Sequence, residues 1–185
     1  MQYRGSSSSL RAAPATLYLL GALTLAGAGP VLAAPRQAPA ISAPELFSGN
    51  TIDLQQFRGQ VVLLEFWASW CGSCWRAFPL LTQLQSRYHD RGLVVLAVSV
   101  DEDVAVAREF ATRRKLPFIL LEDHAGKVAD RYDVEAMPHS VLIDANGIVI
   151  REFVGFGDES EQQLQDAVAV ALASGTPAAG QPPRD

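Results

Sequence analysis

Cys71 and Cys74 are the only cysteines in this 185-residue chain, and two residues separate them. A disulfide between them would close a very short ring, which stabilises a fold little because the stabilisation grows with the length of the closed loop. The spacing suits redox chemistry better, since one thiolate can attack a disulfide and the other can resolve the adduct. Two cysteines also exclude a scaffold stapled by several disulfides and a zinc site of four thiolates.

Metal binding is the alternative use of two thiols. A zinc site would need His89, His124 or His139, but these histidines are scattered along the chain. A Cu(I)-binding module could combine the cysteines with Met137 or His139, because soft sulfur ligands suit Cu(I). The chain has only two methionines, so it holds no methionine-rich copper patch. We expect no metal and no cofactor besides a redox-active disulfide, and copper binding stays an alternative.

The cysteines stand between a predicted strand and a predicted helix. Residues 61–67 form an apolar run of strand length, typical of a strand buried on both faces. Apolar residues then recur at helical spacing from Phe78 to Tyr88, with Pro79 expected to kink the helix. The end of a central strand is where open α/β sheets place their sites.

The rest of the chain alternates strands with helices. An Asn-Gly pair at 146–147 indicates a tight hairpin. This order predicts an α/β fold with a central mixed sheet covered by helices on both faces. We expect strands over 93–100, 118–121, 140–144 and 148–154, and helices around 104–111, 126–132 and 164–172.

Glu65 interrupts the most apolar strand, six residues before Cys71. A buried carboxylate costs several kcal/mol unless it is paired, so its presence there requires a reason. One interpretation is a proton acceptor for Cys74, with a pKa raised by desolvation. The other is a structural ion pair with a nearby arginine.

The first 33 residues have the composition of an export signal. Two arginines precede an uncharged stretch, residues 12–34, which ends in small residues suited to a signal peptidase. We predict that residues 1–33 are a signal peptide; the alternative is an uncleaved anchor formed by residues 12–34, the only contact with a membrane. Either places the protein in the periplasm or elsewhere outside the cytoplasm.

The amino-acid composition limits how many domains the chain can form. With 49% hydrophobic and 19% charged residues, the chain can hold one packed domain, predicted over residues 45–174. A Pro/Ala-rich linker over 34–44 and a disordered Pro/Gly/Ala-rich tail over 175–185 would flank it. The net charge of -5 gives no indication of nucleic-acid binding.

The chain resembles the thioredoxin superfamily in residues 66–74 (FWASWCGSC), in Pro79 and in Met137-Pro138. Within the superfamily it is most similar to the exported TlpA/ResA-type thiol-disulfide oxidoreductases, through residues 54–59, 98–101 and 142–147 and through Gly155. The similarity spans about residues 41–174 and implies a thioredoxin-like fold. A peroxidase of the related peroxiredoxin type is excluded, because Leu64 and Ala68 occupy the places of its characteristic proline and threonine.

The resemblance implies roles for four residues. Cys71, at a helix N-terminus that favours a thiolate, would be the nucleophile, and Cys74 would resolve the mixed disulfide. Pro138 would follow a cis peptide bond and face the cysteines. The strand position of Glu65 often carries a buried Asp that accepts a proton from the second cysteine.

Six further residues are predicted to contact substrate. Trp70 and Trp75 could form an apolar platform for a protein, whereas Trp67 is assigned to the core. His139 replaces a small hydroxyl residue and is interpreted as a solvated loop residue; the alternatives are that it tunes Cys71 or helps to bind a metal. The predicted contacts are Trp70, Gly72, Ser73, Trp75, Met137 and His139.

The resemblance also implies a function and partners. We expect a reductant of cysteines in exported proteins, such as apocytochrome c or copper-site proteins, recharged by a membrane protein that relays electrons. The alternative is a dithiol oxidant that forms disulfides. Both use the same residues and differ only in reduction potential.

Overall fold

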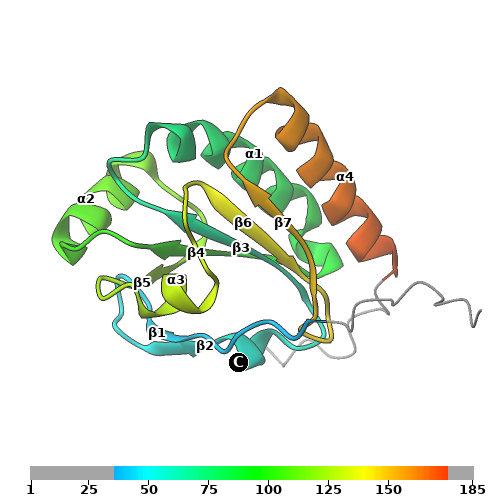
Figure 1. The fold of residues 1–185 in the computed structure, drawn as a ribbon, viewed down its shortest axis with the longest axis horizontal. Coiled ribbons are helices and arrows are strands. Elements are labelled where there is room, and N and C mark those ends of the chain that lie inside the picture. Colours follow the sequence, from blue (N-terminus) through cyan, green and yellow to red (C-terminus); the bar gives the residue numbers. More distant parts are fainter. Residues whose placement is uncertain (1–35, 175–185) are drawn as a thin grey trace, which may run out of the picture. The chain divides into compact units, whose positions relative to one another are not determined.

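Seven consecutive buried residues form strand β3 (Val61–Trp67), the central strand of a five-stranded sheet (Figure 1). The computed structural model describes residues 36–174, so the predicted signal segment 1–33 and the predicted tail 175–185 lie outside the described residues. Within the described part, no helix combines the length and the apolar character needed to cross a membrane.

The sheet is mixed, as predicted. Its strand order is β5-β4-β3-β6-β7. Strands β4 (Leu93–Ser99) and β5 (Ile119–Glu122) run parallel to β3, whereas β6 (His139–Ile143) and β7 (Val149–Val154) form an antiparallel hairpin beside it. The predicted strand boundaries are correct to within one residue. Parallel neighbours need a crossover connection, which explains why helices separate β3, β4 and β5 along the chain. Antiparallel neighbours do not, and a turn joins β6 to β7.

Helices cover both faces of the sheet (Figure 1). One face carries α1 (Gly72–Tyr88), α2 (Val104–Arg114) and α4 (Asp158–Ser174). The other carries the short helix α3 (Lys127–Arg131) and a small hairpin of β1 (Ser42–Pro44) and β2 (Thr51–Asp53). Two short 3-10 helices, η1 (Leu54–Phe57) and η2 (His89–Arg91), precede β3 and β4.

Strand β3 divides its side chains between two cores, because successive residues of a strand point to opposite faces. Leu63 and Trp67 pack in the core that contains Cys74, and the prediction of Trp67 as a core residue is confirmed. Phe66 packs in the other core, against Tyr132. The alternation places Glu65 on the face of the sheet that holds Cys74.

The segment predicted as a linker, 34–44, differs from that expectation. Its last residues form β1, which pairs with β2, and Ile41 and Ala43 are only 2% and 4% exposed. Gln37 also forms a bridge with Ile148. The physical reason is the alternation of apolar residues with proline and serine, which lets one side of the segment cover the sheet while proline stays at an edge position.

Candidate active site

The two cysteines form a disulfide across the first turn of α1, with their Cα atoms 5.3 Å apart. Cys71 is the N-cap residue of the helix, and its Sγ accepts a hydrogen bond of 3.2 Å from the backbone N–H of Cys74. Cys71 is 6% exposed and Cys74 is fully buried. A partner approaching the pair therefore meets Cys71 first, and the helix N-terminus would stabilise a thiolate there.

The bond between Met137 and Pro138 is cis, as predicted. Its loop is held near α1 by Ser73, whose Oγ donates to the carbonyl oxygen of Met137 at 3.4 Å. The carbonyl oxygen of Pro138 accepts from the backbone N–H of Gly155 at 2.8 Å. Two separate contacts thus fix the loop, one to the redox helix and one to the segment after β7.

A hollow of about 430 Å³ opens beside the disulfide, and we call it the cis-proline groove because Met137, which precedes the cis bond, lines it. Trp70, Cys71 and Ser73 line it together with residues 134–137, and Val100 and Ala129 complete its wall. Three of the six predicted substrate contacts (Trp70, Ser73 and Met137) therefore meet in one groove, and Trp70 is 68% exposed. Gly72 is exposed at the start of α1 but does not line the groove, and Trp75 lies outside it.

The loop before Cys71 is anchored by a buried carboxylate that sequence reasoning missed. Asp101, 5% exposed, accepts hydrogen bonds from the backbone N–H of Ser69 at 2.9 Å and from its hydroxyl at 2.6 Å. The hydroxyl of Ser99 donates to the same carboxylate at 2.9 Å. Ser69 and Asp101 follow the adjacent parallel strands β3 and β4, whose carboxyl ends meet at one sheet edge, and that pairing could have been the signal.

Glu65 is fully buried in β3, paired with Ala97 of β4 and Ser140 of β6, on the face of the sheet that α1 covers. Its Oε2 accepts a hydrogen bond of 2.5 Å from the hydroxyl of Ser140, while its Oε1 has no partner. Desolvation raises the pKa of this carboxyl from 4.5 to about 7, against the smaller opposing effect of the Ser140 hydrogen bond. No ion pair within residues 36–174 involves Glu65, so the interpretation as a structural partner of an arginine is wrong.

His139 is not the solvated loop residue that was predicted. It is the first residue of β6, is 4% exposed and packs edge-on against Phe66. Its Nε2 lies 3.1 Å from a carboxylate oxygen of Glu152, which also pairs with Arg36. Desolvation, and then the charge of Arg36, hold its pKa below the usual value. The prediction failed because β6 begins directly after Pro138, and its register places the imidazole in the core opposite Phe66.

The metal alternatives gain no support from the geometry. Among residues 36–174, no three His, Cys, Asp or Glu side chains are grouped so that they could hold a metal ion. His139, one of the two further ligands considered for copper, directs Nε2 toward Glu152.

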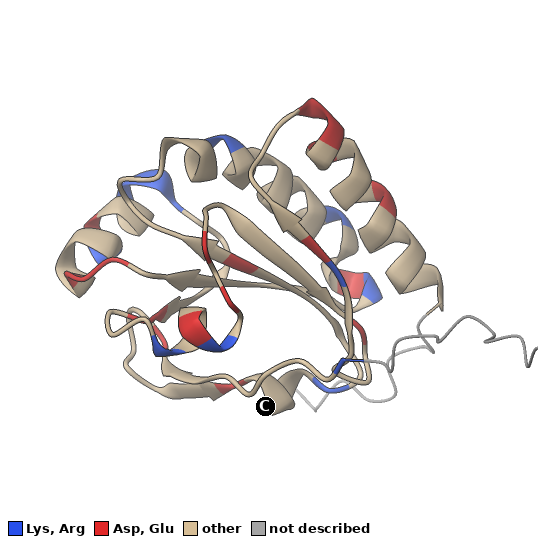
Figure 2. Ribbon diagram, in the orientation of Figure 1, with Lys and Arg blue, Asp and Glu red and all other residues tan. Residues whose placement is uncertain are grey.

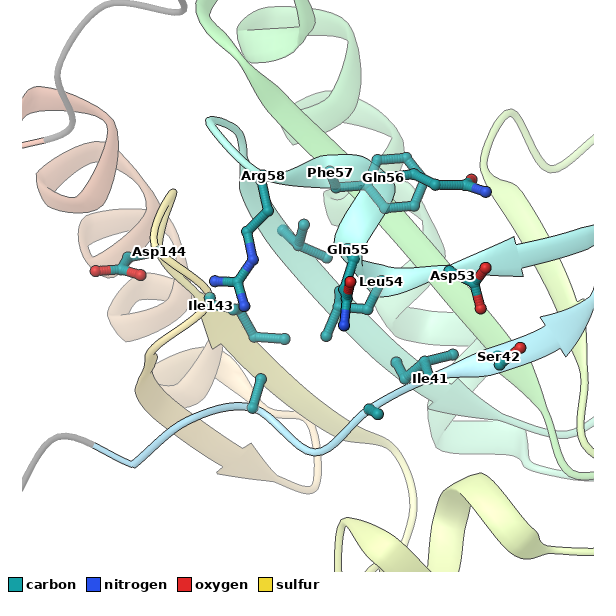
Figure 3. Close-up of a pocket in the computed structure, with 14 residues that line it drawn as sticks. Ile41, Ser42, Asp53, Leu54, Gln55, Gln56, Phe57, Arg58, Ile143 and Asp144 are labelled. Carbon is teal, nitrogen blue, oxygen red and sulfur yellow. The ribbon is translucent and has the colours of Figure 1, made fainter.

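A separate cavity of about 570 Å³ lies at the other end of β3, near Val62 (Figure 3). It is lined by residues 38 and 40–42, by residues 53–58 and by the β6–β7 turn, and Figure 3 shows Arg58 reaching across it toward that turn. The guanidinium of Arg58 donates to the carbonyl oxygen of Asn146. None of the residues predicted to act in the site lines this cavity, so the candidate chemistry belongs to the cysteine end of the sheet.

Comparison with known proteins finds relatives over most of the chain. The Redoxin family model matches residues 33–170. A thiol-disulfide oxidoreductase ResA from Bacillus thuringiensis subsp. konkukian is 31% identical over 131 residues, which cover 71% of this chain and 74% of the relative.

Solved structures with the same fold carry similar names. A thiol:disulfide interchange protein DsbE from Chlorobium tepidum superposes with a TM-score of 0.71 at 35% identity. The match covers 75% of this chain and 96% of the Chlorobium chain. A secreted disulfide oxidoreductase from Mycobacterium tuberculosis, homologous to E. coli DsbE, superposes with a TM-score of 0.61 at 25% identity, covering 70% and 95%.

Proposed function

Because this chain belongs to the ResA-type thiol-disulfide oxidoreductases of the thioredoxin superfamily, we propose that it reduces disulfides in exported proteins through Cys71 and Cys74. The observation that carries the proposal is the position of the pair. Cys71 is the helix N-cap beside the cis-proline groove, and Cys74 is buried on the face that holds Glu65.

The first step is attack by the Cys71 thiolate on one sulfur of the target disulfide. A mixed disulfide forms between Cys71 and the target, the target S–S bond breaks, and the other target sulfur leaves as a thiolate. The amides of the first turn of α1 stabilise the Cys71 thiolate before attack. The Cys74 N–H, which already donates to the Cys71 Sγ, supplies one of these interactions.

The second step is attack by Cys74 on the Sγ of Cys71. The mixed disulfide breaks, the second target thiolate is released, and the Cys71–Cys74 disulfide forms, so two electrons pass from the protein to the target. Cys74 must lose a proton before it attacks. Glu65 is the proposed acceptor, because it is buried on the same face, has one oxygen without a partner and has a pKa of about 7.

The cis-proline groove orients the target during both steps. Pro138 has no backbone N–H, so the backbone of Met137 is the edge with which an extended substrate segment can pair. Trp70, an exposed lining residue of the same groove, adds apolar contact area next to Cys71.

Each cycle leaves the protein oxidised, so a reductant has to restore the two thiols. We propose a membrane protein that relays electrons from the cytoplasm as that partner. The location outside the cytoplasm is supported by the signal-like residues 1–33 and by the Mycobacterium tuberculosis protein, which is described as secreted. Cysteines of apocytochrome c, or cysteines of a copper site before metal insertion, are the proposed targets.

A pair of substrate peptides tests this proposal. One carries a Cys-x-x-Cys-His disulfide, as in an apocytochrome, and the other is the same peptide as a dithiol. We expect the reduced protein to reduce the disulfide faster than the oxidised protein oxidises the dithiol. The opposite order would make the protein a dithiol oxidant, which uses the same residues.

Trapping variants test the roles of the cysteines. Cys71→Ser should abolish reduction of the peptide, whereas Cys74→Ser should accumulate a stable mixed disulfide with it, measured by mass spectrometry under non-reducing conditions. Normal turnover by Cys74→Ser would refute the two-cysteine mechanism.

A further inference from the structure

A second hollow of about 580 Å³ lies next to the redox pair and outside the cis-proline groove. It is formed by Trp75 in the first turn of α1, by Ser69 and by side chains of α2. Ser69 lines this hollow and Trp70 lines the groove, so the two depressions adjoin at the residues just before Cys71. We call it the arginine hollow; its lining residues are Ser69, Trp75, Val106, Phe110, Arg113 and Arg114.

The floor of the arginine hollow is rigid and aromatic. The indole Nε1 of Trp75 donates to the carbonyl oxygen of Ser69 at 3.1 Å, which fixes the ring relative to the loop before Cys71. The ring of Phe110 lies 5.5 Å from that of Trp75, and the guanidinium carbon of Arg114 lies 5.1 Å from the Trp75 ring centre. A cation is thus held over an aromatic surface that remains 38% exposed at Trp75.

The positive charge of the hollow is available to a ligand. Arg114 forms no ion pair within residues 36–174, because its contacts are with the rings of Trp75 and Phe110. Arg113 lies 3.8 Å from Glu109, but both side chains are 69% exposed, and such surface pairs contribute little. Figure 2 shows that α2 ends in basic residues, whereas acidic residues precede its start.

This local charge opposes that of the whole chain, which is -5. The general field of the protein would therefore favour a basic partner, while the surface beside the disulfide favours an acidic one. The exposed side chains of Val106 and Trp75 add apolar area to the two arginines. Combined apolar and cationic surface, adjoining the groove that Cys71 lines, fits an acidic polypeptide segment better than a small anion.

We propose that the arginine hollow binds an acidic side chain of the protein substrate, in the segment that flanks the substrate's reactive cysteine. The inference rests on the proposed function in one respect, namely that the substrate is a polypeptide. The cis-proline groove then holds the backbone next to the cysteine, and the arginine hollow selects among substrates by the charge of a neighbouring residue.

Three peptides with the same disulfide, flanked by Glu, Gln or Lys, provide the test. The second-order rate constant is measured at low salt for reduced protein with oxidised peptide and for oxidised protein with reduced peptide. We expect the Glu peptide to react about tenfold faster than the Lys peptide, and added salt to diminish the difference, because salt screens exposed charges. In the double variant Arg113→Gln/Arg114→Gln the ratio should fall to about two or less.

A second pair of arginines, near the C-terminal end of α1, provides a matched control. Arg87 and Arg91 also lie over an aromatic ring, that of Tyr88, at the other end of α1. The double variant Arg87→Gln/Arg91→Gln removes the same charge and the same kind of contact, and it should keep the wild-type ratio. Equal loss of the ratio in both double variants, or a wild-type preference for the Lys peptide, would overturn the inference.

The two reaction directions separate this inference from the proposed function. If only the oxidised protein reacts, the reductant function fails, while the ratio of Glu to Lys peptide still tests the hollow. If the reduced protein reduces all three peptides at one rate, the function stands and the hollow is not a substrate site.

Discussion

Glu65 and His139 occupy neighbouring positions of the β3–β6 pair, since Glu65 is paired with Ser140 and His139 with Phe66. Both side chains are buried and titratable, yet they lie on opposite faces of the sheet. His139 faces a carboxylate, Glu152, which is itself paired with Arg36. Glu65 has a single hydroxyl partner, no cation and one oxygen without a hydrogen bond.

The difference shows that burial alone does not identify a functional group. The polar contacts of His139 lead outward, through Glu152, to the segment before β1, and they tie that segment to the sheet. The contacts of Glu65 end inside the core, on the face that contains Cys74. A carboxyl with no fixed counter-charge and a pKa of about 7 can change its protonation state during a reaction at little cost.

The largest effect that would separate the two residues is kinetic. Glu65→Gln should slow resolution of the mixed disulfide by about 100-fold or more, because positioned proton acceptors contribute factors of this size, while initial attack by Cys71 is unchanged. In the wild type, the rate of mixed-disulfide resolution should rise as the pH increases through about 7, and in the variant this rise should be absent. Single-turnover decay of the mixed disulfide, followed by rapid quenching, measures both.

His139→Asn is the comparison for that experiment. This variant should keep the rise of the resolution rate with pH near 7, because His139 faces away from α1. If the rise of the resolution rate with pH were lost in His139→Asn and kept in Glu65→Gln, the roles assigned to the two residues would be reversed.

A second effect concerns stability. Below pH 4.5 Glu65 is neutral in the folded and the unfolded protein; between pH 4.5 and about 7 only the unfolded chain ionises, so stability falls as pH rises. A shift from 4.5 to about 7 corresponds to about 3 kcal/mol of lost stability above pH 7. Urea denaturation between pH 4 and 8 should show this loss in the wild type and not in Glu65→Gln. Parallel pH profiles for the two proteins would contradict the buried, unpaired state of Glu65.

The smallest expected effect is on stability and concerns His139, on the face of the sheet opposite Glu65. The pKa of His139 is lowered by folding, so its neutral form stabilises the protein above pH 6.5, and this contribution is lost as pH falls. Glu152→Gln should cost about 1 kcal/mol of stability near neutral pH, because it weakens two partly exposed contacts, the hydrogen bond with His139 and the ion pair with Arg36. Denaturation and peptide reduction measured on the same samples should show the stability change with no change in resolution.

Local patterns predicted the elements that position the site. The apolar run of β3 and the Asn-Gly turn depend on neighbours in sequence, and the strands beside them were predicted within a residue. The helical spacing marked only the part of α1 from Phe78 to Tyr88, and the family resemblance placed the start of the helix at Cys71. The cis bond before Pro138 came from the family resemblance, since an X-Pro pair by itself favours trans.

Features that depend on pairing between distant segments were not predicted. The contact of Ser140 with Glu65 and the burial of His139 both follow from the β3–β6 register, which no local pattern specifies. Strand β1 was assigned to a linker because three residues, the last of them a proline, carry too little pattern for a strand. The arginine hollow joins α1 to α2, and its arginines have the ordinary spacing of a solvated helix end.

The reduction potential of the Cys71–Cys74 pair tests the central claim most directly. The protein would be equilibrated with glutathione buffers, and the fraction of disulfide measured by thiol alkylation and mass spectrometry. A reductant of exported proteins should have a value near that of thioredoxins, about -270 mV. A value near about -120 mV would make the pair an oxidant and contradict the assignment as a reductant.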